Sequence, residues 1–315
     1  MSAALRRRLP YLTGTAGALL IALSAILVRL ADVSPSTAAV FRCTYALPFL
    51  ALVAAHERRR LGPRPWSQRR LALLAGVFFA ADLALWHHAI GLVGAGLATV
   101  LANTQVLLVG LAAWAVLAER PERRVLVAVP VVLGGVVLIS GVLGGDAYGE
   151  DPRLGAAFAL LSAVAYAGFL LTLRHGNQDR RRPAGPLFDA TLVGALVSVL
   201  AGAVVGDVDL VPTWPAHGWL VALALNSQVV GWLLISVSLP RLPAVVTSLL
   251  LLLQPVGSLL LGVVLLDEAP SPLQWAGAAV VLAGIGVATL GRGRAADQPA
   301  PAEAATASSL EELPG

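Results

Sequence analysis

Two carboxylates of this 315-residue chain stand in nearly the same phrase. Residues 116–121 read VLAERP and residues 265–270 read LLDEAP, so Glu119 and Glu268 each close a long apolar run two residues before a proline. A pair of carboxylates can supply the acid and the base of a catalytic site. The same residues can instead mark the ends of two helices, because proline stops a helix and a carboxylate can fix the turn that follows.

Further polar side chains lie inside the apolar runs themselves. They are Arg42, Asp82, Trp86, Thr99, Asn103, Asn226 and Gln254. A charge near the middle of a bilayer costs about 2.5–3.5 kcal/mol on insertion scales, so such residues are expected to face the interior of a helix bundle. There a carboxylate can bind a substrate or carry a proton, an aromatic ring can contact a cation, and an amide can bond a substrate or a neighbouring helix. These seven residues are the candidates for a substrate cavity or a coupling site.

The elements that must position these residues are membrane-spanning helices. Apolar residues make up 57% of the chain and charged residues 13%, about half the charged share of soluble proteins. The mean hydropathy is +0.80. A bilayer core of about 30 Å needs roughly 20 apolar residues per helix, and strands of that length are not expected. We therefore predict an all-α, polytopic membrane protein with ten spans, at residues 11–30, 35–55, 71–90, 95–118, 125–142, 154–173, 187–206, 219–239, 244–266 and 273–290.

The placement of the arginines predicts the orientation. If the N-terminus is cytoplasmic, 19 of the 22 basic residues, all of them arginine, fall on the cytoplasmic side and only Arg153 lies in an outer loop. We therefore expect a multi-pass protein of the plasma membrane with both termini in the cytoplasm, and a disordered cytoplasmic tail over residues 291–315. The net charge of +4 then reflects topology, and nucleic acid is not expected as a partner.

The chain also repeats itself with an offset of 149 residues. Gln105 aligns with Gln254 and Glu119 aligns with Glu268, within otherwise similar apolar runs. Since each half holds five spans, the second half enters the membrane from the opposite side, which is the inverted repeat of many secondary transporters. The two predicted halves are residues 1–143 and 154–290. This topology places Glu119 at the inner face and Glu268 at the outer face, so they are expected to be structural helix-end carboxylates and not a catalytic pair.

Two segments carry a resemblance to a known family. TVLANTQVLLVGLAAWAVLAERPERRVLVAVPVVLGGVVL and VTSLLLLLQPVGSLLLGVVLLDEAPSPLQWAGAAVVLAGIGV resemble the closing segments of EamA-type repeats in the drug/metabolite transporter superfamily. AVFRCTYALP is similar to the family's second helix with its arginine, here Arg42, and DLALWHHAI to a third-helix phrase. The resemblance implies ten helices in two inverted halves. The family commonly has proline in both closing segments, whereas this chain has Val106 and Pro255, so we expect span four to be straighter than span nine.

The predicted topology also sets the depth of the polar residues. At about 1.5 Å per residue, Arg42, Asp82, Asn103 and Asn226 lie about 10–12 Å below the outer ends of their spans. Arg42 and Asp82 are expected to pair, either as a structural salt bridge or with Asp82 as a proton-coupling or substrate-binding carboxylate. Trp86 follows Asp82 by one helical turn and either forms a cavity wall or anchors the helix at the membrane interface.

The function that these features favour is secondary active transport. The resemblance implies export of a small organic metabolite or drug, with alternating access between the two halves and with proton coupling as an open question. Uptake or exchange is one alternative, and a non-transporting scaffold or receptor is another. The chain has no lysine for a phosphate-binding loop and no Ser/His/Asp arrangement or metal motif, so we expect neither an enzyme nor a cofactor. The oligomeric state is left open.

Overall fold

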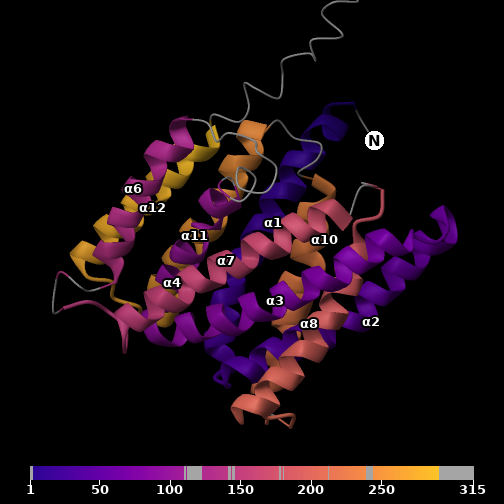
Figure 1. Ribbon diagram of the computed structural model, residues 1–315, viewed down its shortest axis with the longest axis horizontal. Coiled ribbons are helices and arrows are strands. Elements are labelled where there is room, and N and C mark those ends of the chain that lie inside the picture. Colours follow the sequence, from indigo (N-terminus) through magenta and orange to yellow (C-terminus); the bar gives the residue numbers. More distant parts are fainter. Residues whose placement is uncertain are drawn as a thin grey trace, which may run out of the picture.

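The computed structural model describes residues 3–109, 111, 123–140, 143, 146–176, 179, 181–211, 213–238 and 244–290. Every regular element in these ranges is a helix (Figure 1). The elements are α1 Ala3–Ala31, α2 Pro35–Leu61, α3 Trp66–Val93, α4 Ala95–Ala102, α6 Arg123–Ile139, α7 Pro152–Gly176, α8 Ala184–Val205, α9 Ala216–Leu223, the π-helical segment η1 Ala224–Gly231, α10 Trp232–Ser238, α11 Ala244–Leu266 and α12 Pro272–Leu290. The predicted all-α class is therefore confirmed for the described part of the chain, whereas Glu119 and the predicted tail lie outside it.

Six of the described helices are long and apolar enough to cross a bilayer. They are Leu9–Ala31, Pro35–Leu61, Trp66–Val93, Pro152–Leu173, Ala184–Val205 and Ala216–Ser238. Four shorter apolar helices occupy the other predicted spans, at Ala95–Val109, Leu126–Ile139, Leu253–Leu266 and Pro272–Val287. The count of ten crossings remains a prediction, because these four do not reach the length that a bilayer core requires within the described residues.

The outer surface of the bundle is apolar. Large aliphatic side chains such as Leu52, Leu200 and Val204 are 72%, 67% and 88% exposed. A water-soluble protein seldom exposes contiguous patches of such residues, whereas lipid solvates them without cost. This surface, together with the long apolar helices, shows that the protein is built for a membrane.

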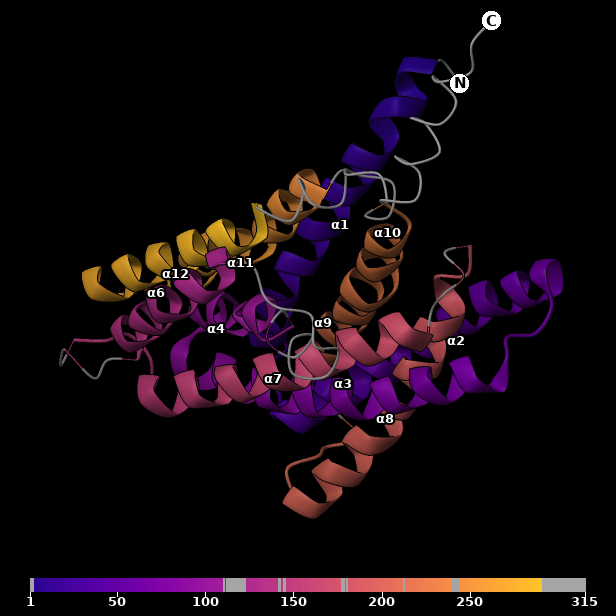
Figure 2. The ribbon, with the colours of Figure 1, turned by 45° about the horizontal axis from the view of Figure 1, so that its top comes forward.

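Helices from the two halves of the chain pack directly against each other. The largest interfaces include α3 with α7, α6 with α12 and α2 with α8. Figures 1 and 2 show α6 lying along α12 at one edge of the bundle. In the predicted repeat, α7 corresponds to α1, and the helix formed by α9, η1 and α10 corresponds to α3. The equivalent of the α3–α7 contact is therefore the contact of α1 with α9, η1 and α10, and it is present too. The core is therefore shared between the halves and not divided into two separate domains.

The fourth predicted span is interrupted, contrary to expectation. A turn at Asn103 and Thr104 follows α4, and the next backbone bond runs over three residues only, from the nitrogen of Val106 to the oxygen of Asn103 at 3.2 Å. The carbonyl of Thr99 accepts from both the backbone nitrogen of Asn103 at 3.2 Å and its side-chain amide at 2.8 Å. By contrast, α11 continues as a helix through Pro255. The prediction that span four is the straighter one is therefore wrong.

A second irregularity lies in the eighth span. Here α9, η1 and α10 form one apolar helix over Ala216–Ser238, and its middle third is π-helical. π-helical turns are rare, and they often occur next to functional sites because they rotate side chains away from the regular helical register. In this chain the π-helical segment carries Asn226 and Gln228.

Candidate functional site

A cavity of about 70 Å³ lies between the two halves. Its wall comes from α1, α2, α3, α4, α7, α10 and α11. The predicted candidates that line it are Arg42, Asp82, Trp86, Thr99, Asn103 and Gln254. The other lining residues are Ile21, Ser24, Phe79, Leu83, Ala102, Tyr166 and Trp232. The fold thus brings together six polar or aromatic candidates that the sequence marks one by one.

Arg42 supplies a buried cation to this wall. Only 4% of the residue is exposed, and its Nε donates to Oε1 of Gln228 at 3.2 Å. The centre of the guanidinium lies 5.9 Å from the ring centroid of Phe79 and 5.8 Å from that of Trp86, so both rings offer it cation–π contact. Its Nη1 is buried and has no hydrogen-bond partner among the described residues. A buried N–H group that is left unbonded is costly, and an acceptor atom of a bound ligand would satisfy it.

Asp82 lines the same cavity but does not pair with Arg42. Its Oδ1 accepts a 2.6 Å hydrogen bond from Oγ of Ser162 in α7. Between these two described residues there is no ion pair, since Gln228 holds the guanidinium and Ser162 holds the carboxylate. The predicted direct salt bridge is therefore wrong. The physical reason is that each charge finds a neutral hydrogen-bonding partner on a helix of the other half, which sequence positions on α2 and α3 do not reveal.

Aromatic rings form much of the remaining wall. Trp86 is 8% exposed and faces Arg42, so the alternative of an interfacial anchor is wrong. On the opposite half, the lining rings of Tyr166 and Trp232 lie 6.3 Å apart and both contact the ring of Phe169, with centroid distances of 5.9 and 5.6 Å. The indole Nε1 of Trp232 is buried and has no hydrogen-bond partner in the described part of the chain. The cavity therefore offers flat apolar surfaces together with a second unused N–H donor.

The two candidates on the fourth span are held by local bonds. Thr99 donates to the carbonyl of Ala95 at 2.8 Å and accepts from Oγ of Ser258 in α11 at 3.1 Å. Asn103 is the C-cap of α4, and its side-chain amide donates to the carbonyl of Thr99. Gln254 reaches the cavity from α11. The bond between Thr99 and Ser258 joins α4 to α11, which belong to the fourth and ninth predicted spans.

Asn226 is the one candidate that does not line the cavity. Its Nδ2 donates to the carbonyl of Leu20 in α1 at 2.7 Å, so it links η1 to α1. Gln228, two residues further along η1, accepts the hydrogen bond from Arg42 and donates to Thr191 at 3.0 Å. Depth along a helix can be estimated from sequence, but the rotation of the helix, here altered by the π-helical segment, cannot.

The sequence matches a known family over nearly all of these helices. Residues 8–141 and residues 153–290 each match the model of the EamA-like transporter family. The chain belongs to this family. Membership of the EamA-like family indicates a membrane transporter rather than an enzyme. The resemblance seen in the sequence is thereby confirmed, and EamA-like proteins form part of the drug/metabolite transporter superfamily.

Individual relatives agree with the family match. A protein of Bacillus subtilis (strain 168) named "Uncharacterized transporter YwfM" is 25% identical over 237 residues, which are 74% of this chain and 77% of that protein. A solved crystal structure shares 23% sequence identity, covers 92% of this chain and 99% of its own, and superposes with a TM-score of 0.61. At that identity the solved structure supports the EamA-like fold alone.

Glu268 of this EamA-like transporter lies away from the cavity. It is 3% exposed, and its carboxylate accepts from the backbone nitrogens of Ala95 at 2.5 Å and Gly96 at 3.2 Å. It therefore caps the start of α4, where the first N–H groups of a helix have no partner in the helix itself. Glu119, its mate in the repeat, is among the residues that the structure leaves undescribed.

Sequence reasoning missed Tyr166 and Trp232, which line the cavity, and it chose Asn226 over Gln228 on the same span. Trp232 lies in the middle of a predicted span, whereas tryptophans of membrane helices usually lie near the interface, and that signal could have marked it. Tyr166 and Gln228 are likewise polar groups inside apolar runs. Within the described ranges no three His, Cys, Asp or Glu residues come together to hold a metal ion.

Proposed function

We propose that this EamA-like protein is a secondary active transporter that exports a small organic metabolite or drug across the plasma membrane. The observation that carries the proposal is the cavity between the halves, whose wall combines a buried guanidinium, a carboxylate and aromatic rings. Arg42 and Trp232 each hold an unused N–H donor there, which suits an acceptor group of the substrate. Asp82 suits a cationic or hydrogen-bond-donating group of the substrate.

The size of the cavity supports alternating access. Pockets for small ligands usually hold about 300–1,000 Å³, whereas this cavity holds about 70 Å³. The described conformation is therefore a contracted one, and a substrate requires the halves to separate. The interrupted α4 and the π-helical η1 flank the cavity and are the places where helices bend at least cost. The exchange of contacts between halves supports the inverted repeat, residues 1–143 and 154–290, as the basis of this rocking motion.

We assign proton coupling to Asp82. The carboxylate has one described hydrogen bond, from Ser162, and it lines the cavity close to where a substrate would lie. Uptake of a proton changes Asp82 from an anion to a neutral donor. The affinity of the cavity for a substrate of given charge then depends on whether the proton is bound, which is the requirement for coupled transport.

The decisive experiment is flux in proteoliposomes with and without an imposed pH gradient. A substrate is first found by screening compounds for a rise in the melting temperature of the purified protein. We expect the gradient to accelerate flux in the unsubstituted protein and in the control Asp146→Asn, whose carboxylate lies in an exposed loop, but not in Asp82→Asn. Gradient-driven flux that persists in Asp82→Asn excludes this residue as the coupling site. Binding without flux favours a receptor, and a new chemical product without flux favours an enzyme.

The orientation is proposed from the arginines. With both termini in the cytoplasm, the basic loops lie inside and Arg153 lies outside. In a Cys43→Ala background, which removes the sole cysteine, we expect a membrane-impermeant maleimide to label Arg153→Cys on intact cells and Arg59→Cys only after permeabilisation. The reverse labelling pattern overturns the orientation. Comparing the rates of substrate flux in right-side-out and inside-out vesicles then decides between export and uptake.

A further inference from the structure

A second, larger cavity of about 290 Å³ lies at the arginine-rich end of the bundle, away from the central cavity. It is bounded by the end of α2, the connection to α3 and the start of α8. Its charged lining residues are Glu57, Arg58, Arg64, Arg69, Arg182 and Asp189. Four guanidinium groups thus face two carboxylates, so the cavity carries an excess of positive charge. We refer to it as the basic pocket.

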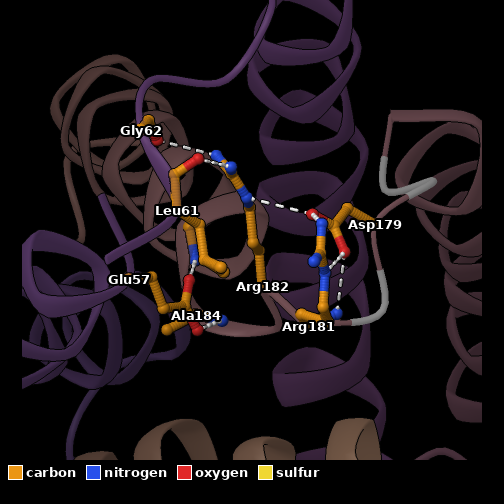
Figure 3. Close-up of polar contacts among 8 residues, drawn as sticks. Glu57, Leu61, Gly62, Asp179, Arg181, Arg182 and Ala184 are labelled. Atoms are coloured by element: carbon orange, nitrogen blue, oxygen red, sulfur yellow. Dashed lines mark hydrogen bonds and ion pairs between the residues drawn. The ribbon is translucent and has the colours of Figure 1, made fainter. Parts of the chain in front are cut away.

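Both carboxylates of the basic pocket already have partners. Glu57 accepts from the backbone nitrogens of Ala184 and Gly185, at 2.9 Å each, and so caps the start of α8 (Figure 3). Asp189 forms ion pairs with Arg64 and, at 3.3 Å, with Arg69. Neither carboxylate is therefore free to neutralise a further arginine.

Arg182 closes one side of the basic pocket. It donates to the backbone oxygens of Leu61 and, at 2.8 Å, of Gly62, and it also bonds Asp179 at 3.1 Å (Figure 3). Hydrogen bonds from Arg181 lower the pKa of Asp179 to about 2, so this carboxylate is charged at neutral pH. Asp179 and Arg181 lie outside the pocket lining and largely satisfy each other. The arrangement fixes the end of α2 against the start of α8.

Two arginines of the basic pocket keep unused donors. The side chain of Arg64 is only 9% exposed, yet its buried Nη1 has no hydrogen-bond partner within the ranges that the structure describes. Arg58 is exposed, and its guanidinium forms no ion pair or hydrogen bond with any described residue. A buried guanidinium N–H without an acceptor is unfavourable, and oxyanions such as phosphate are the preferred acceptors of guanidinium groups.

The rest of the pocket is apolar and runs toward the membrane interior. Ala51, Ala54 and Phe188 line it. Ala51 lies seven residues before Arg58 on α2, which is about 10 Å deeper along the helix. Trp66, 61% exposed at the start of α3, packs under Arg69 with the guanidinium 5.7 Å from its ring. An exposed tryptophan stacked with an arginine is typical of the headgroup level of a bilayer.

We propose that the basic pocket binds an anionic phospholipid, with its phosphate held by Arg58 and Arg64 and an acyl chain laid along the alanine face of α2. The guanidinium groups alone would suit any phosphate compound. The apolar extension toward Ala51 suits only a ligand that has a hydrocarbon chain below its phosphate. This lipid site is separate from the central cavity and does not depend on the direction of transport or on its coupling.

The test is lipid binding by the full-length protein, delipidated in a neutral detergent. Native mass spectrometry counts bound dioleoylphosphatidylglycerol against dioleoylphosphatidylcholine, and melting temperatures are measured with each lipid and with millimolar sodium phosphate. We expect preferential binding of phosphatidylglycerol, reduced about fivefold in Arg58→Gln and in Arg64→Gln. The matched control is Arg70→Gln, an exposed arginine one residue after Arg69 that does not line the pocket.

Each result decides the proposal. Equal loss of preference in Arg70→Gln overturns it, because the attraction would then be that of the whole basic surface. Stabilisation by sodium phosphate equal to that by phosphatidylglycerol also overturns it and assigns the pocket to a soluble phosphate compound. Arg58→Gln removes a side chain without partners, so a loss of lipid preference in this variant does not arise from misfolding. Since the readout is binding, a failure of the proposed transport activity leaves this result unaffected.

Discussion

The carboxylate of Glu268 lies 2.5 Å from the backbone nitrogen of Ala95, a residue 173 positions earlier in the chain. The bond joins the corner between α11 and α12 to the first turn of α4. Thr99, which lines the central cavity, lies about one helical turn after Ala95 on α4. Glu268 follows the end of α11 in the sequence, but in the structure it caps the start of α4. It thereby positions part of the candidate site.

Replacing Glu268 by glutamine should destabilise the protein. An amide keeps one acceptor oxygen but turns its NH₂ group toward the other backbone N–H, so the nitrogen of Gly96 loses its partner in a buried setting. We expect a loss of about 1–3 kcal/mol in the free energy of unfolding. Thermal unfolding in detergent micelles measures it. The control is Asp267→Asn at the exposed neighbouring carboxylate, and equal melting of the two variants would contradict the capping role.

Two amides on the same π-helical segment should behave differently. Gln228→Leu keeps the volume of the side chain but removes the bonds to Arg42 and Thr191, so the guanidinium loses the acceptor that orients it. We expect the KM for transport to rise about tenfold, which corresponds to about 1.4 kcal/mol. Asn226→Ala removes the bond to Leu20, outside the cavity, and should lower the melting temperature while KM stays within about twofold. Similar KM values in both variants would show that Gln228 does not position Arg42.

Trp232→Phe tests the unused indole N–H in the cavity. Phenylalanine retains a ring against Phe169 but cannot donate a hydrogen bond. If the substrate accepts from Nε1, the loss of one bond of about 0.5–1.5 kcal/mol raises KM by roughly two- to twelvefold. Concentration-dependent flux in proteoliposomes provides the measurement, with Trp66→Phe at an exposed tryptophan as the control. An unchanged KM would mean that Nε1 of Trp232 does not contact the substrate.

The contact between α6 and α12 requires glycine at its centre. A Cβ added at Gly277 would lie 2.7 Å from the backbone oxygen of Gly135 and 2.8 Å from Cβ of Leu138, which is closer than atoms pack. Gly277→Ala should therefore force the helices apart at a cost of about 1–3 kcal/mol in stability. Gly134→Ala adds a methyl group that meets nothing within 4 Å, so its melting temperature should be unchanged or slightly higher. A Gly277→Ala protein as stable as Gly134→Ala would refute the close approach.

Much of the fold could be read from the sequence because it depends on composition over long windows. The described apolar helices fall on the ten predicted runs, since burial in lipid demands continuous apolar stretches whatever the tertiary contacts. The break at Asn103 could not be read in this way. There the backbone bonds change from four-residue to three-residue spacing at Thr104 and Val106, whereas proline at position 255 is accommodated within α11.

The sequence by itself determined which polar groups are confined to the apolar spans, and hence that Arg42, Asp82 and Trp86 must face protein and not lipid. Only the tertiary structure decided their partners. Gln228 and Ser162, both from the second half, hold the two charges apart, and no spacing along α2 or α3 encodes that choice. The physical reason is that the hydrophobic effect acts on whole segments, whereas a hydrogen bond depends on the rotation and register of two helices to within about an ångström.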